Sequence, residues 1–216
     1  MHQLINSLKS IKESLERKGS SQDYVRVALK EELQNYVLAA IYNDTRTNNL
    51  VFIGGTCLRK LFGLNRLSED LDFENPSEVS LEIIASVVED YFKSIEFNDF
   101  DYNIQKNENV SRLTLRFSIL NDIGLSPFET EKLHVKIETT AGTANATLLT
   151  PFSHDNLAML VKHYPIETLM AGKISACLNR VWENGTTGVK VKGRDYYDLI
   201  WYMHKGILPD INKLNT

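Results

Sequence analysis

Residues 51–73, which read VFIGGTCLRKLFGLNRLSEDLDF, constrain the fold more than any other part of the chain. The apolar run before Gly54-Gly55 is short and bounded by polar residues, which is typical of a buried strand. Residues 56–62 then predict a short helix that the next glycine ends. Residues 67–73 alternate between apolar and polar side chains, as in a second strand. The segment therefore predicts the order strand, glycine turn, helix, strand.

The glycine turn is a candidate phosphate-binding element. Gly54 and Gly55 have no side chain, so a ligand can approach the backbone closely. A helix N-terminus directly after them offers unpaired N–H groups and the positive end of the helix dipole. Thr56 is a candidate to cap this helix or to donate a hydrogen bond to a phosphate oxygen. Arg59, one turn later, is placed to reach a phosphate; an exposed surface role is the alternative.

Asp70 and Asp72 form a candidate metal site. Residues two apart on a strand point to the same face, so both carboxylates project together while Leu71 faces the other way. Adjacent carboxylates repel each other without a counter-charge, and Mg²⁺ supplies that charge through oxygen ligands. Two such ions would activate an attacking oxygen and stabilise a leaving pyrophosphate. A glycine turn alone, or two solvated aspartates alone, would be an ordinary surface feature, but their conjunction is specific.

Ser68 precedes Asp70 by two residues, so in a regular strand its hydroxyl shares the face of the carboxylates. A phosphate on this hydroxyl would add negative charge beside them and disrupt metal or nucleotide binding. Ser68 is therefore a candidate regulatory position, and the alternative is a plain polar strand residue.

The remaining apolar periodicity predicts an α/β (α+β) fold, with a mixed β-sheet flanked by helices. We expect a core of residues 1–164 and a small helical lobe of residues 165–216. The expected helices cover residues 4–15, 22–43, 81–95, 166–182 and 195–204, and the expected further strands cover residues 102–105, 112–119, 133–139, 146–149 and 157–161.

The composition excludes some classes of protein and indicates a cellular location. The chain has 216 residues with a net charge of −4, which excludes a globally basic nucleic-acid coat protein but allows a local basic patch. The two cysteines, Cys57 and Cys177, do not have the spacing of a metal site or a disulfide framework. No apolar run approaches the roughly 20 residues that span a bilayer, and the N-terminus lacks a signal-peptide hydrophobic region. We expect a cytoplasmic protein without a membrane partner.

Gly54-Gly55-Thr56 followed by Asp70-Leu71-Asp72 resembles the motif of the DNA polymerase β-like nucleotidyltransferase superfamily. The resemblance implies a third carboxylate on a later strand, and Glu138 is the candidate because His134, Lys136 and Glu138 alternate with apolar residues. A solvated strand face is the alternative for Glu138. Asp122 and Glu129 are weaker candidates because they lie in an expected loop.

The C-terminal part of the chain indicates one family within this superfamily. Lys173 and Arg180 on one helix, followed by Arg194-Asp195 and Asp198 in an R-D-x-x-D-L motif, are similar to the AbiEii-type nucleotidyltransferase toxins. The resemblance implies that the three basic residues bind the nucleotide. It makes Asp195 a candidate to hold Lys173 or to assist deprotonation of the acceptor, while Asp198 is expected to be structural. A helix pair between Arg194 and Asp198, four residues apart, is the alternative.

The resemblance covers roughly residues 50–205 and implies a toxin of the kind found in abortive-infection and other toxin–antitoxin systems. Such an enzyme would use Mg²⁺ and an NTP to transfer NMP to RNA, most plausibly to the tRNA 3′ end, and so block translation. A cognate antitoxin is an expected partner. The alternatives are a protein or small-molecule acceptor, or an NTP-binding regulatory module without turnover.

Overall fold

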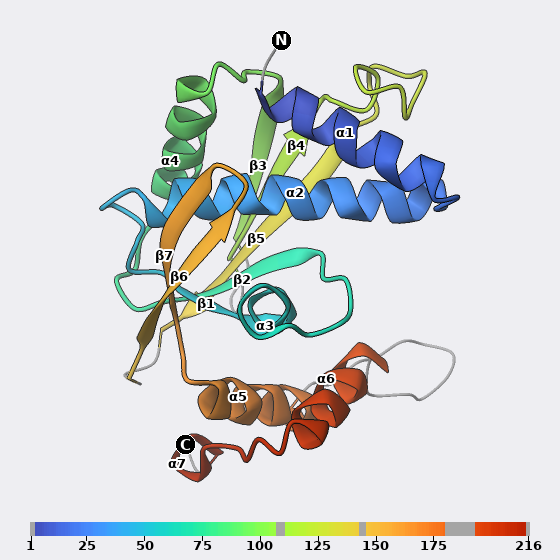
Figure 1. Cartoon of the computed structure of the whole chain (residues 1–216). Coiled ribbons are helices and arrows are strands. Elements are labelled where there is room, and N and C mark those ends of the chain that lie inside the picture. The colour runs from blue at the N-terminus through green and yellow to red at the C-terminus, as the bar shows by residue number, and fades with distance from the viewer. Residues whose placement is uncertain (1–2, 107–110, 143–145, 180–192, 215–216) are drawn as a thin grey trace.

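The computed structural model describes residues 3–106, 111–142, 146–179 and 193–214. These residues form one mixed sheet with strand order β3-β4-β5-β2-β1-β7-β6 (Figure 1). The β2–β5 and β1–β7 pairs are parallel, and the other neighbouring pairs are antiparallel. The strands are β1 (Val51–Ile53), β2 (Asp70–Asn75), β3 (Phe100–Lys106), β4 (Ser111–Phe117), β5 (Leu133–Ala141), β6 (Leu148–His154) and β7 (Leu157–His163).

Helices surround this sheet unequally. Helices α2 and α4 contact the sheet, and α1 packs on α2, whereas α5 packs with α6 and α7 on the far side of α3 (Figure 1). The helices are α1 (Gln3–Arg17), α2 (Gln22–Tyr42), α3 (Gly54–Phe62), α4 (Leu81–Ser94), α5 (Ile166–Asn179), α6 (Gly193–His204) and α7 (Ile211–Leu214). The mixed sheet flanked by helices confirms the predicted fold class.

Alternation along the central strands separates an apolar face from a polar face. On β2, Leu71 and Phe73 are fully buried, and on β5 the same holds for Val135 and Ile137. The aromatic ring of Phe73 lies 6.4 Å from that of Tyr42 on α2, so this face is the one that α2 covers. The intervening residues of β2 and β5 are polar and project to the opposite face.

Among the element boundaries that differ from the expectation, two lie in the predicted site. Strand β2 begins at Asp70 rather than Leu67, because Gln34 of α2 donates hydrogen bonds to the carbonyls of Ser68 and Glu69 and occupies backbone groups that a strand would pair. Helix α3 begins already at Gly54. The short helix α7 was not expected.

No helix in the described ranges is long and apolar enough to cross a membrane. In the described part of the chain, Cys57 and Cys177 form no disulfide, and burial raises the pKa of Cys57, which suits a packing role.

Candidate functional site

A row of carboxylates lies where β2 runs between β1 and β5. The register pairs Asp72 with Glu138 on β5 and with Ile53 on β1, while Asp70 pairs with Lys136. Since side chains alternate along a strand, Asp70, Asp72 and Glu138 project from the same face of the sheet. The structure thus brings the three predicted metal ligands to neighbouring positions on two strands.

The row extends further than the sequence analysis predicted. Glu74 continues it on β2, two residues after Asp72, and accepts a hydrogen bond of 2.6 Å from the hydroxyl of Tyr164. The period-two pattern Asp70, Asp72, Glu74 was visible in the sequence and would have identified Glu74. Tyr164 could not be found in this way, because it lies 90 residues away in the chain.

A cleft of about 350 Å³ opens in front of this row, between the sheet, α3 and the helices α5 and α6. Polar side chains from opposite walls line it, and leucine, isoleucine and alanine side chains form its apolar part. Asp70 does not line the cleft; its side chain is 39% exposed and lies 4.0 Å from the Lys136 ammonium. The polar lining residues are Asp72, Glu74, Glu138, Thr140, Tyr164, Thr168, Lys173, Tyr202 and Lys213.

Gly54 and Gly55 form one wall of the cleft. At each position a neighbouring side chain occupies the space that a Cβ atom would need. Gly54 has φ of +75°, and a Cβ there would overlap the Oδ2 atom of Asp72. A Cβ on Gly55 would lie 2.5 Å from the Nη2 atom of Arg66. The two glycines therefore allow Asp72 and Arg66 to pack against the backbone at the start of α3, where the unpaired N–H groups of the helix lie.

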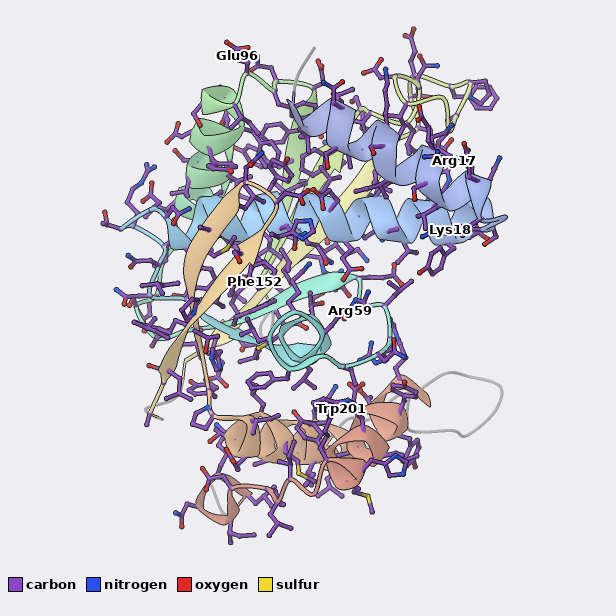
Figure 2. The ribbon with its side chains drawn as sticks, viewed as in Figure 1. Arg17, Lys18, Arg59, Glu96, Phe152 and Trp201 are labelled. Carbon is purple, nitrogen blue, oxygen red and sulfur yellow. The ribbon has the colours of Figure 1, made fainter. Side chains whose placement is uncertain are left out.

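In the structure, Thr56 and Arg59 both have protein partners outside the cleft. Thr56 is fully buried and donates a hydrogen bond of 2.6 Å to the carbonyl of Asp70, so it links α3 to β2 instead of capping the helix. The Arg59 guanidinium donates to both carboxylate oxygens of Glu31 on α2. Figure 2 shows Arg59 on the side of α3 that faces α2, away from α5 and α6.

A network of charges holds Lys173 in the cleft. Its ammonium lies 3.2 Å from Asp195 and 2.9 Å from Asp198, both on α6. Asp198 is completely buried and also accepts two hydrogen bonds, of 2.6 and 2.7 Å, from Arg66 in the α3–β2 connection. Burial raises the pKa of Asp198, but Arg66 and Lys173 outweigh it and hold that pKa below its usual range.

The contact between Asp195 and Lys173 agrees with the expectation that Asp195 holds this lysine. Asp198 joins Arg66 and Lys173, which agrees with the structural role expected for it. The alternative pair between Arg194 and Asp198 is wrong, because Arg66 occupies Asp198. Arg194 instead lies 3.8 Å from Glu69, half-exposed and outside the cleft lining. Arg180 lies outside the described residues.

Ser68 lies in the connection before β2, not in the strand. It is half-buried, and its hydroxyl would lie 3.1 Å from a Cβ on Gly55. The expected strand geometry is wrong, but the hydroxyl is still beside the glycine turn.

The carboxylates of Asp70, Asp72 and Glu138 are chemically suited to bind a divalent cation. Carboxylate oxygens on adjacent strands repel each other, and they are the ligands that Mg²⁺ prefers. In the structure, Glu138 accepts hydrogen bonds from the Arg112 guanidinium, with a shortest distance of 2.5 Å, so arginine and lysine side chains provide the counter-charge. Among the described residues, the oxygens of Asp70, Asp72 and Glu138 do not all lie within 4.8 Å of one another.

The Tyr202 hydroxyl is a further feature that sequence reasoning missed. Tyr202 on α6 is fully buried, lines the cleft, and its hydroxyl has no hydrogen-bond partner among the described residues. An unpaired buried hydroxyl costs free energy, so a ligand that accepts or donates a hydrogen bond there would remove this cost.

Comparison with protein families gives a match over most of the chain. The model of the AbiEii nucleotidyl transferase toxin, from type IV toxin–antitoxin systems, matches residues 36–215. Comparison with curated proteins gives no match.

Two solved structures from Helicobacter pylori are similar to the chain. JHP933 is 24% identical with a TM-score of 0.56, and the match covers 82% of this chain and 66% of that chain. A candidate nucleotidyltransferase is 22% identical with a TM-score of 0.51, and the match covers 81% of this chain and 67% of that chain. The chain thus spans about two thirds of their length, and at this identity the likeness shows a shared fold.

The two left-handed glycines at the ends of α3 give a matched test of the packing at Asp72. Gly63→Ala, at φ +77° with open space around it, should destabilise the protein by roughly 1–2 kcal/mol through backbone strain alone. Gly54→Ala has the same strain plus overlap with Asp72, and should cost roughly 1–3 kcal/mol more. Urea denaturation measures both values; equal losses would contradict close packing of Asp72 on Gly54.

Proposed function

The chain belongs to the AbiEii nucleotidyl transferase toxin family, and from this premise we propose that it transfers NMP from an NTP to an RNA hydroxyl. The observation that carries the proposal is the placement of Asp72 and Glu138 opposite Lys173 across one cleft that begins at Gly54-Gly55. Nucleotidyl transfer uses carboxylates that hold a divalent cation and a positively charged side chain that binds phosphate.

Each wall of the cleft has a distinct part in binding the triphosphate. The N-terminus of α3 offers backbone N–H groups to phosphate oxygens, and Lys173 contributes a point charge from the opposite wall. Asp195 and Asp198 keep that ammonium in place and so act as positioning residues. Asp70, Asp72 and Glu138 would hold Mg²⁺, which when bound would stabilise charge on the phosphates.

The chemical step is an in-line displacement. The acceptor hydroxyl oxygen forms a bond to the α-phosphorus, and the bond between that phosphorus and the bridging oxygen of the β-phosphate breaks. Pyrophosphate leaves with the bridging electron pair, and the hydroxyl proton passes to a carboxylate of the row. Asp70 is suited to the acceptor side, because its side chain is exposed and lies outside the cleft lining.

Basic side chains beside the row favour an RNA acceptor. Arg112 on β4 pairs in register with Glu138, and Thr114 pairs with Lys136, so Arg112, Lys136 and Arg116 share the polar face with the carboxylates. A phosphate backbone crossing this face would meet these cations next to Asp70. The tRNA 3′ end is the acceptor that we propose, since its modification would block aminoacylation and translation.

The setting follows from the reaction and the family. Toxins of this family act within type IV toxin–antitoxin systems, so we include a cognate antitoxin as a partner. The cytoplasm is the proposed location because it supplies NTPs and tRNA. A protein or small-molecule acceptor remains the alternative, and the assay below separates the cases.

The reaction is tested by incubating the protein with Mg²⁺, total tRNA and each α-³²P-labelled NTP in turn. We expect label on tRNA with one NTP preferred. Asp72→Asn should reduce transfer at least about 100-fold, because removing a metal ligand loses several kcal/mol of charge stabilisation. Asp90→Asn, at an exposed carboxylate paired with Arg46, is the matched control and should retain activity.

The same assay distinguishes the acceptors. Pyrophosphate release that requires cell lysate, without label on tRNA, would point to a protein or small-molecule acceptor. Release of no pyrophosphate with any acceptor would contradict the enzymatic proposal and leave a nucleotide-binding module.

Tyr202→Phe tests whether the orphan hydroxyl contacts the nucleotide. The substitution should raise KM for the NTP roughly 3–10-fold, the equivalent of one hydrogen bond, and should not reduce folding stability because the hydroxyl has no partner in the free protein. Tyr197→Phe is the control, since its hydroxyl donates to the carbonyl of Asn65 at the surface. An unchanged KM in Tyr202→Phe would contradict a nucleotide contact.

We propose Ser68 as a regulatory position at which phosphorylation would inhibit the enzyme. A phosphate there would place negative charge next to Gly55, where the triphosphate is proposed to bind. Ser68→Asp should therefore lower transfer at least about 10-fold, while Ser68→Ala stays near the wild-type rate. Transfer assays on both variants measure this, and equal rates would exclude charge at Ser68 as a switch.

A further inference from the structure

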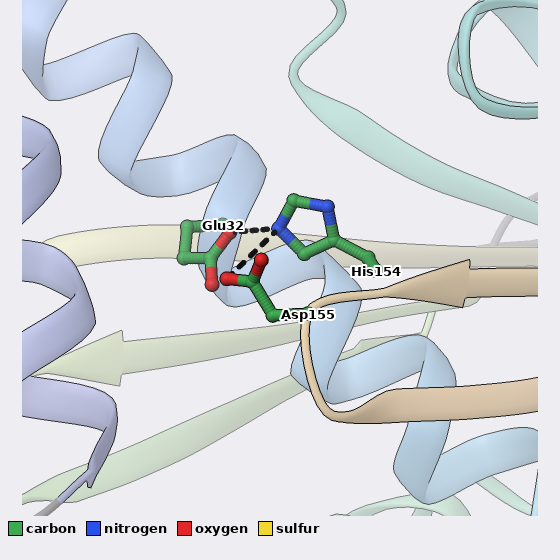
Figure 3. Close-up of side chains that lie close together, drawn as sticks. All are labelled: Glu32, His154 and Asp155. Carbon is green, nitrogen blue, oxygen red and sulfur yellow. Dashed lines mark hydrogen bonds and ion pairs between the residues drawn. The ribbon is translucent and has the colours of Figure 1, made fainter.

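A second cluster of polar side chains lies away from the cleft, where the β6–β7 hairpin meets α2. Figure 3 shows Glu32 from α2 with His154 from the end of β6 and Asp155 from the hairpin turn. The Nε2 atom of His154 lies 2.7 Å from Glu32 Oε2 and 3.9 Å from Asp155 Oδ2. One ligand atom from each residue lies within 4.8 Å of the other two, so small side-chain rotations would direct all three to one ion.

The buried carboxylate of Glu32 lacks a permanent partner charge. Its side chain is 3% exposed, and its hydrogen bonds come from the Ser7 hydroxyl and the Asn35 amide, which are neutral. His154 provides a positive charge only when it is protonated. A buried carboxylate without a cation is costly, so the site is electrostatically suited to a bound cation.

The other nearby cation is directed elsewhere. The Lys60 ammonium donates to the Asn35 side-chain oxygen at 2.5 Å and to the carbonyl of Glu31 at 3.3 Å, not to Glu32. Burial lowers the pKa of Lys60 to about 8, although Glu31 and Glu32 act to raise it, so its ammonium loses its charge only above neutral pH.

A cavity gives access to the cluster. Its volume is about 370 Å³, and it is open to solvent between α1, α2, α3 and β6. Glu32 and His154 form part of its lining, with Phe152, which Figure 2 shows beside α2, as an apolar wall. An ion and its water ligands can therefore reach both residues without unfolding the hairpin.

We propose that Glu32, His154 and Asp155 bind a divalent transition-metal ion of the zinc class. One imidazole nitrogen and two carboxylate oxygens are ligands that Zn²⁺ accepts, whereas Mg²⁺ and Ca²⁺ prefer oxygen alone. Water completes the coordination. Ser7 and Asn35 hydrogen-bond the Glu32 carboxylate and so orient it toward His154.

The bound ion has a structural consequence. Glu32 belongs to α2, which packs against α1, whereas His154 ends β6 and Asp155 lies in the turn of the β6–β7 hairpin. The metal thus joins the edge of the sheet to the helical layer that covers it. This site is independent of nucleotide transfer, because none of its residues lines the cleft at Asp72.

The test measures binding of Zn²⁺ alone by isothermal titration calorimetry. It uses the full chain with Asp70→Asn and Asp72→Asn, so that the carboxylates of the cleft do not add a second site. We expect one equivalent of Zn²⁺ and a higher melting temperature with the metal. Co²⁺ should give visible absorption bands of a nitrogen- and oxygen-ligated ion.

His154→Ala and Asp155→Asn in the same background should each weaken Zn²⁺ binding at least about 10-fold. Asp155 is exposed, so its variant keeps the test valid even if His154→Ala folds poorly. His134→Ala, at an exposed histidine of β5, is the matched control and should bind normally. Zn²⁺ binding that is absent, or unchanged in both variants, would overturn the proposal and leave a hydrogen-bonded clamp between Glu32 and His154.

Discussion

The buried carboxylate of Asp198 is the interaction on which the cleft depends. It accepts two hydrogen bonds from Arg66, which follows α3, and it lies 2.9 Å from Lys173 on α5. Three segments that are far apart in the sequence thus meet at one charge. Its removal would leave the partly buried Arg66 and Lys173 with less counter-charge, and breaking an ion pair at a buried carboxylate is destabilising. The same contact that attaches the helices to the core therefore directs Lys173 toward the carboxylates.

Strand register supplies the other half of the site. The antiparallel β1–β2 pair and the parallel β2–β5 pair place Asp72 between Ile53 and Glu138. If the register of β2 shifted by one residue, the Asp72 side chain would point to the apolar face that α2 covers, and Leu71 would point into the cleft. Burial of Leu71 and Phe73 on one face consequently determines the direction of the carboxylates on the other.

Local patterns predicted the parts of the site that depend on neighbouring residues. Alternation placed Asp70 and Asp72 on one face, and the glycine turn located the start of α3. The pairing of Arg66 with Asp198 joins residues 132 apart in the chain, and no periodicity reports such a contact. The partners of Thr56 on β2 and of Arg59 on α2 could not be predicted for the same reason, because they become visible only when the fold is known.

The central claim is that the cleft between Gly54 and Lys173 is where a nucleotide and its metal bind. The most direct measurement is a crystal structure of the protein with a non-hydrolysable α,β-methylene NTP and Mn²⁺, located by anomalous scattering. The account predicts the triphosphate between the start of α3 and Lys173, with Mn²⁺ on Asp72 and with Glu138 released from Arg112. A nucleotide bound outside this cleft, or triphosphate density without Mn²⁺ at Asp72, would contradict it.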